Sequence, residues 1–272
     1  MMWESEDLEA GARRKVVVLI AVVAAAALGF WLWYSYVAHH RPAAPPPPVS
    51  ATPPPPASTE PEIANPLPAA NEAAAAALPA LNDSDTLARD SIAGVLGRGA
   101  VERLLVPQNI VRHIVATVDN LPRKKVAVEL RPVRPTPGAT AIATQGEITA
   151  LSDANFERYA PLVKAVQGTD VKALALVYRR LYPLFQQSYE DLGYPGKYFN
   201  DRLVEVIDHL LQAPVVQAPI PLVQPRVMYE YADADLEGRS AGQKLLIRMG
   251  PANERAIKAK LREFRAEIVN KK

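Results

Sequence analysis

The chain contains no cysteine among its 272 residues, and this absence excludes several kinds of chemistry. It can form no disulfide, offers no thiolate to a zinc ion and has no thiol nucleophile. A domain of this composition must therefore be stabilised by its own core. An excess of one charge is also missing: the formal net charge is +2, which gives no electrostatic reason to propose nucleic acid as a partner.

Signature motifs of catalysis are missing as well. The sequence has no G-x-S-x-G nucleophile motif, no P-loop and no G-x-G-x-x-G fingerprint. Beyond residue 80 only His113 and His209 carry an imidazole. The sequence therefore predicts no cofactor, no metal site and no catalytic residue.

One long hydrophobic run stands out, at residues 16–34 (VVVLIAVVAAAALGFWLWY). As a helix it would reach roughly 28 Å, about the thickness of the hydrocarbon core of a bilayer. Aromatic residues, which favour membrane interfaces, follow at its end: Trp31, Trp33, Tyr34 and Tyr36. We predict a single-pass transmembrane helix over residues 16–37 that contacts the lipid bilayer. A cleaved signal peptide is the alternative, but the run is longer than most signal peptides and no A-x-A site follows.

The charged residues beside this run predict its orientation. Arg13, Arg14 and Lys15 precede it, whereas Arg41 is the only Lys or Arg close behind it. Flanking cations stay in the cytoplasm. We therefore expect residues 1–15 to be a short cytoplasmic segment and the C-terminal part to lie on the other side of the membrane.

Residues 38–80 are rich in proline and alanine. Twelve of the 27 residues from 42 to 68 are proline, which lacks a backbone donor and fixes φ. Such a tract prefers extended polyproline II and could reach on the order of 80 Å. We expect a disordered linker that holds the following domain away from the membrane. A PxxP ligand for an aromatic groove is the sharper alternative.

Residues 81–272 are expected to form a mainly helical domain with a minor β-hairpin or small sheet. Apolar periodicity and end signals predict helices at 107–121, 153–166, 171–192, 198–211 and 251–268, with a kink or break at Pro183. A hairpin is expected to turn at Gln145-Gly146, and a strand is expected after Pro225.

Several segments of this domain resemble an uncharacterised proteobacterial family of single-pass membrane-anchored proteins whose domain has no known function. They are ATVDNLPR (116–123), LRPVRPTPG (130–138), YRRLYPLFQQSYEDLGYPGKYFNDRLVEVIDHLL (178–211) and GQKLLIRMGPANERAIKAKLR (242–262). The resemblance implies a one-span inner-membrane protein with a Pro/Ala linker. It supplies no catalytic residues.

Aromatic residues concentrate around positions 178–200, which makes this region the candidate binding surface. An aromatic groove there could bind an envelope protein or a wall-related ligand, but an aromatic helix–helix core is the competing interpretation. The turn 193–201 is expected to present Lys197 and Asn200. The candidate binding residues are Tyr178, Tyr182, Gln186, Tyr189, Tyr194, Lys197, Tyr198 and Asn200.

Two functional classes follow from these observations. The first is a non-enzymatic interaction domain that a membrane anchor presents to the periplasm. The second is an envelope hydrolase acting on glycan or peptide, because acidic residues and a histidine fall close together at Glu190, Asp191, Asp201, Glu205 and His209. Paired carboxylates can cleave glycosidic bonds only at a specific separation, which a sequence does not reveal.

Overall fold

The computed structural model describes residues 63–67 and 77–269. The predicted cytoplasmic segment, transmembrane helix and most of the linker lie outside these residues. Among the residues described, no helix combines the length and apolar character needed to cross a membrane.

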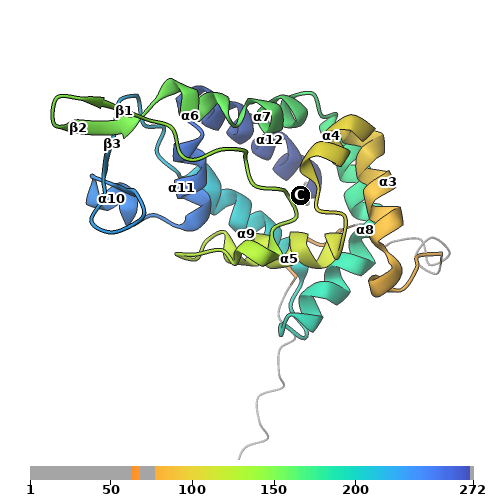
Figure 1. The fold of residues 1–272 in the computed structure, drawn as a ribbon. Coiled ribbons are helices and arrows are strands. Elements are labelled where there is room, and N and C mark those ends of the chain that lie inside the picture. The colour runs from red at the N-terminus through yellow and green to blue at the C-terminus, as the bar shows by residue number, and fades with distance from the viewer. Residues whose placement is uncertain (1–62, 68–76, 270–272) are drawn as a thin grey trace, which may run out of the picture. The chain divides into compact units, whose positions relative to one another are not determined.

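The described residues form a mainly helical structure with one small antiparallel sheet (Figure 1). The helices are α3 (Asp85–Leu96), α4 (Arg98–Leu104), α5 (Ile110–Asn120), α6 (Asp153–Glu157), α7 (Ala160–Gln167), α8 (Val171–Asp191), α9 (Phe199–Leu211), α10 (Ala234–Glu237), α11 (Ala241–Arg248) and α12 (Pro251–Ile268). Two 3₁₀ turns are η1 (Leu81–Asp83) and η2 (Val128–Leu130). The predicted fold class of this part is confirmed.

The sheet has the strand order β1 (Ile142–Gln145), β2 (Ile148–Leu151), β3 (Ile220–Val223) and β4 (Glu230–Tyr231). The predicted hairpin is present, with Gln145 opposite Ile148, so its turn is Gly146-Glu147, one residue later than expected. The strand expected after Pro225 is confirmed only at its end, because β4 covers Glu230–Tyr231, and the longer strand β3 lies before Pro225 and ends at Val223. Ile220 and Leu222 face the core, and this alternation of buried and exposed residues places β3 before Pro225 rather than after it.

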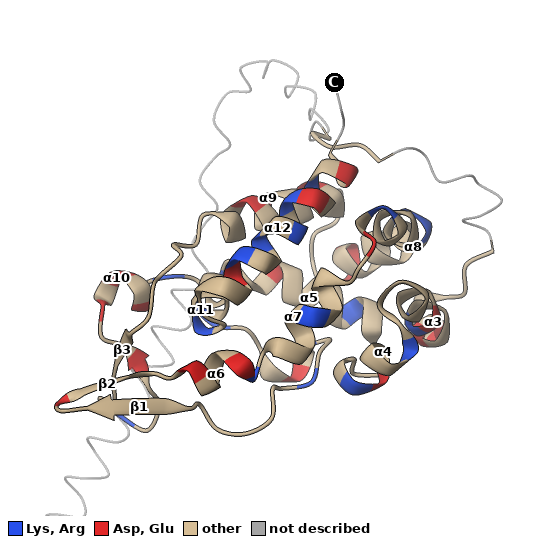
Figure 2. Ribbon diagram, turned by 90° about the horizontal axis from the view of Figure 1, so that it is seen from above, with Lys and Arg blue, Asp and Glu red and all other residues tan. Residues whose placement is uncertain are grey.

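The long helix α8 lies at the centre of the largest core cluster. It contributes Tyr178, Leu181, Leu184 and Phe185, which pack with buried residues of α5 and α9 and with Ile268 at the end of α12. α12 also packs against α7, α9 and α11 and carries charged residues of both signs along its length (Figure 2). The sheet and α10 lie at the opposite end from α3 and α4 and share their own core with α11 (Figure 1).

Two predicted helix boundaries and one predicted break differ from the structure, each for a different physical reason. The expected helix 153–166 is two helices, because Pro161 in the first turn starts α7 anew. α5 begins at Ile110 rather than at residue 107, because Asn109 adopts a left-handed conformation (φ 52°). α8 continues through Pro183 without a break, since buried residues on both sides of the proline hold the helix against the core.

Candidate functional site

The aromatic residues of the predicted site lie mostly inside the molecule. Tyr178 and Tyr189 on α8 are 6% and 4% exposed and belong to the main core. The Tyr189 ring stacks on that of Tyr194, with 4.6 Å between the ring centroids. Burial raises the pKa of the Tyr178, Tyr182 and Tyr189 hydroxyls, so all three stay protonated, and those of Tyr178 and Tyr182 donate hydrogen bonds to Asn200 and Gln186. Much of this region is therefore the aromatic core that was the competing interpretation.

Gln186 joins α8 to the start of α9. Its Oε1 atom accepts hydrogen bonds from the Tyr182 hydroxyl and the Phe199 N–H, both at 2.9 Å. Its Nε2 atom donates to the Lys197 carbonyl at 2.7 Å. The loop before α9 is thus held in one conformation, with Lys197 exposed and Asn200 turned inward.

Asn200 corrects the expectation of a residue presented on the loop surface. It is fully buried near the start of α9. Its Oδ1 atom accepts from the Tyr178 hydroxyl at 3.1 Å, and its Nδ2 atom donates to the carbonyls of Ile268 and Asn65, both at 2.9 Å. A buried amide needs all of these partners, and the inward orientation provides them.

Residues 63–67 of the predicted linker lie against this region and make five hydrogen bonds to it. Asp201 accepts the N–H of Ala64 (3.1 Å) and the N–H of Asn65 (2.7 Å), together with the Asn65 side-chain amide (3.1 Å). The Tyr198 hydroxyl accepts the N–H of Leu67 at 3.0 Å, and Asn200 donates to the Asn65 carbonyl. We call Tyr198, Asn200 and Asp201 the docking site. Four of its five hydrogen bonds are to backbone groups of the docked segment.

Local sequence explains why Asp201 suits this role. It lies in the first turn of α9, where the helix dipole stabilises a negative charge. Asp85 of α3 uses the same geometry, because its two carboxylate oxygens accept the consecutive N–H groups of Asn109 and Ile110, each at 2.8 Å. In both cases one carboxylate satisfies two backbone donors of a distant segment.

The Leu67 side chain adds an apolar contact to the docking. It is partly buried and packs against the main core cluster, whereas Ile63 at the other end of the segment is 47% exposed. Pro66 between them disfavours helical backbone in Asn65, and the segment bends at Ala64 and Asn65, where both N–H groups meet the Asp201 carboxylate.

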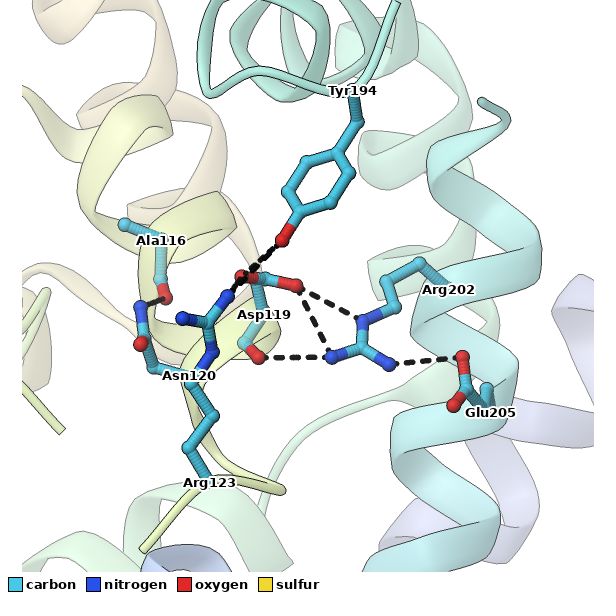
Figure 3. A network of polar contacts seen from close by, with 7 residues as sticks. All are labelled: Ala116, Asp119, Asn120, Arg123, Tyr194, Arg202 and Glu205. Atoms are coloured by element: carbon cyan, nitrogen blue, oxygen red, sulfur yellow. Dashed lines mark hydrogen bonds and ion pairs between the residues drawn. The ribbon is translucent and has the colours of Figure 1, made fainter. Parts of the chain in front are cut away.

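A second polar network lies on the other side of the α8–α9 loop, around Asp119 at the end of α5 (Figure 3). The Asp119 side chain is 2% exposed and forms ion pairs with Arg123 (2.5 Å) and Arg202 (3.1 Å). The Tyr194 hydroxyl donates to the same carboxylate at 3.2 Å, and Arg202 reaches Glu205 at 2.9 Å. Two arginines compensate the buried charge, so this network holds α5, the loop and α9 together.

The residues proposed for hydrolysis are each occupied by a different partner. Glu190 accepts from Gln186 (2.7 Å), Asp191 pairs with Arg112 (3.0 Å), Asp201 holds residues 63–67, Glu205 pairs with Arg202, and His209 Nε2 lies 2.8 Å from the Ser240 hydroxyl. Within residues 63–67 and 77–269, no three His, Asp or Glu side chains come close enough to hold a metal ion.

Sequence reasoning missed Asn65, Leu67, Asp119 and Arg202 as members of these sites. The only available signals were weak: Leu67 is one of few large apolar residues in the proline-rich tract, and Asp119 directly follows Val118, a position of the apolar stripe of α5.

Fold and site together define a mainly helical domain whose aromatic core and polar groups hold a short segment of its own chain. The chain matches a protein family model described as a protein of unknown function (DUF3014) over residues 110–265, and it belongs to that family. The matched range runs from the first residue of α5 into α12, so it contains the docking site but not the docked segment. No curated protein and no solved structure matches the chain.

Proposed function

We propose that this protein is a membrane-anchored cell-envelope protein whose C-terminal domain is a non-enzymatic interaction module presented to the periplasm. In this proposal residues 16–37 span a bacterial inner membrane in a single pass, residues 1–15 are cytoplasmic and the proline-rich tract is the spacer. The apolar run, the cations before it and the aromatic residues at its end support this arrangement.

The recognition of residues 63–67 by the docking site is the observation that carries the interaction role. Tyr198, Asn200 and Asp201 bind backbone N–H and C=O groups, which every peptide provides. Leu67 supplies a side chain that packs on the core. The site therefore suits a peptide that bends as Ala64 and Asn65 do and carries an apolar residue at the position of Leu67. We propose that the partner is such a segment of another envelope protein, which competes with the chain's own residues 63–67.

The test uses the full chain in detergent and a fluorescent peptide of residues 60–69. Leu67→Asp should vacate the docking site without altering it, because a carboxylate at this position cannot pack on the apolar core. We expect the peptide to bind the Leu67→Asp variant more tightly than the wild type, in which the site is occupied. Adding Asp201→Ala should weaken binding roughly 30-fold, whereas adding Glu147→Ala at the hairpin tip should leave it unchanged.

A pull-down from solubilised membranes extends the test to the natural partner. We expect Leu67→Asp to recover more of it than the wild type, and the Leu67→Asp/Asp201→Ala double variant to recover much less than Leu67→Asp. If both variants recovered equal amounts, the docking site would not be the interaction surface. Hydrolysis of envelope glycan or peptide by the full chain would instead favour the second class of function, which no contact among the described residues supports.

A further inference from the structure

A second site lies away from the docking site, in a pocket of about 460 Å³ between the end of α5, the loop 124–140, the α6–α7 junction and α11. This volume falls within the range of roughly 300–1,000 Å³ that is typical of small-molecule sites. The loop forms one wall, and backbone hydrogen bonds fix it beside α4: Val106 N–H to the Pro132 carbonyl (2.8 Å) and Arg134 N–H to the Leu104 carbonyl (2.7 Å). Figure 1 shows this loop running from α5 past α4 toward β1.

The charged residues that line this pocket are all cationic. They are Lys124, Arg131, Arg134, Arg158, Lys244 and Arg248, and no Asp or Glu is among the lining residues. Of these six cations, only Lys244 forms an ion pair with another described residue. Its Nζ atom lies 2.5 Å from a carboxylate oxygen of Glu237. The other five cations form no ion pair among the described residues, so the pocket concentrates positive charge in a protein of net charge +2.

Neutral groups, rather than carboxylates, hold several of these cations in place. The Arg158 guanidinium donates to the Pro137 carbonyl at 3.0 Å and to the Asn155 Oδ1 atom at 2.7 Å. Lys124 donates to the Gly238 carbonyl. Such hydrogen bonds position a cation but leave its charge uncompensated, and like charges gathered in one pocket favour the binding of an anion.

The pocket also has apolar walls. Leu121, Tyr159 and Leu162 line it, and Leu245, which lines it as well, is 38% exposed. A neighbouring pocket of about 410 Å³ shares Arg158 and Arg248 and is lined by hydrophobic residues that include the exposed Met228. A ligand for this site therefore has an anionic group and an apolar part.

We propose that this pocket binds an amphipathic organic phosphate, with its phosphate held by the arginines and its apolar part on Leu121, Leu162 and Leu245. Four of the six cations are arginine, whose planar guanidinium binds phosphate oxygens in pairs. A phosphate monoester carries a charge of about −1.5 to −2 at neutral pH and so compensates more cations than a single carboxylate does. This site uses none of the docking residues and is independent of the peptide-binding role.

Calorimetric titration of the full chain in non-ionic detergent tests the proposal with three probes: hexyl phosphate, inorganic phosphate and hexanol. We expect hexyl phosphate to bind saturably, inorganic phosphate to bind at least tenfold more weakly and hexanol not to bind. Arg248→Gln and Arg131→Gln should each weaken hexyl phosphate binding tenfold or more. The matched control Arg262→Gln, which alters an exposed arginine of α12, should leave it unchanged.

Circular dichroism melting of each variant separates a binding defect from a folding defect. Neither Arg131 nor Arg248 forms an ion pair among the described residues, and the charge of Arg248 acts on Glu237 only from a longer distance, so we expect both variants to stay folded with at most a small loss of melting temperature. Absence of saturable binding by hexyl phosphate would overturn the proposal. So would equal affinities of the wild type and of folded Arg248→Gln and Arg131→Gln variants.

A lipid headgroup and a soluble phosphate ester share the chemistry that this pocket recognises. Dihexanoyl phosphatidic acid and dihexanoyl phosphatidylcholine, compared at equal concentration in the same detergent, carry the same acyl chains and differ in headgroup charge. Phosphatidic acid binding more tightly than both phosphatidylcholine and hexyl phosphate would support the proposal with a lipid as the source. Hexyl phosphate binding more tightly than phosphatidic acid would support it with a soluble ester, and tightest binding of phosphatidylcholine would overturn it.

Discussion

Replacing Asp201 by alanine should release residues 63–67 while leaving the helical domain folded. The carboxylate accepts three of the five hydrogen bonds that hold this segment. Hydrogen bonds to charged groups contribute about 1.5–3 kcal/mol each when buried, but these lie at a partly exposed surface where water replaces them. We therefore expect a combined loss of about 2 kcal/mol, which corresponds to a roughly 30-fold change in the docking equilibrium.

Hydrogen–deuterium exchange followed by mass spectrometry measures this change directly. In Asp201→Ala the amides of Ala64 and Asn65 should exchange roughly 30-fold faster than in the wild type, because Asp201 is their hydrogen-bond acceptor. Glu205→Ala is the matched control: its carboxylate lies on the same helix, is 67% exposed and contacts Arg202 instead. Unchanged exchange at residues 63–67 in Asp201→Ala would refute the reasoning.

Three further predictions concern stability, pH and topology. Asn200→Ala should lower the unfolding free energy by about 2–4 kcal/mol in a denaturant titration, because it leaves the Tyr178 hydroxyl and the Ile268 carbonyl without their partner; an unchanged midpoint would contradict this assignment. Partial burial raises the pKa of Glu237, but hydrogen bonds from Lys244 and a backbone N–H outweigh burial and bring the pKa below 4.5. Its contribution to stability should therefore be present above pH 4.5, decline as the pH falls toward the lower folded pKa and be absent at every pH in Glu237→Gln. Alkaline phosphatase fused to the C-terminus should be active in a bacterial host, and an inactive fusion would reverse the proposed orientation.

Local signals in the sequence determined those elements whose ends are set by neighbouring residues. Helix α12 begins at Pro251, as predicted from a proline in the first turn after Gly250, and ends at Ile268 as expected. The hairpin β1–β2 follows from two short runs of β-formers around a glycine turn. In both cases the residues that determine the element lie within a few positions of one another, so the sequence alone was sufficient to predict it.

Tertiary structure alone decided which groups meet across long stretches of chain. Asp201 and Asn65 are 136 positions apart, and Asp85 holds the start of α5 from 25 residues away. No periodicity encodes such pairs, because a carboxylate binds whichever donors the packing brings to it. The same reason explains why Asn200, in a turn that reads as exposed, is buried.

For the candidate sites too, the sequence indicated one part and the tertiary structure decided the other. The sequence alone directed attention to residues 178–200, because aromatic residues at helical spacing indicate either a core or a binding surface. Only the packing of α8 against α5 and α9 placed Tyr178 and Tyr189 in the core and left Tyr198 and Asp201 to hold the linker. Nothing in the sequence indicated the cationic pocket, because its six charged residues are dispersed from position 124 to position 248. They come together only because the folded chain places the loop 124–140 near α11.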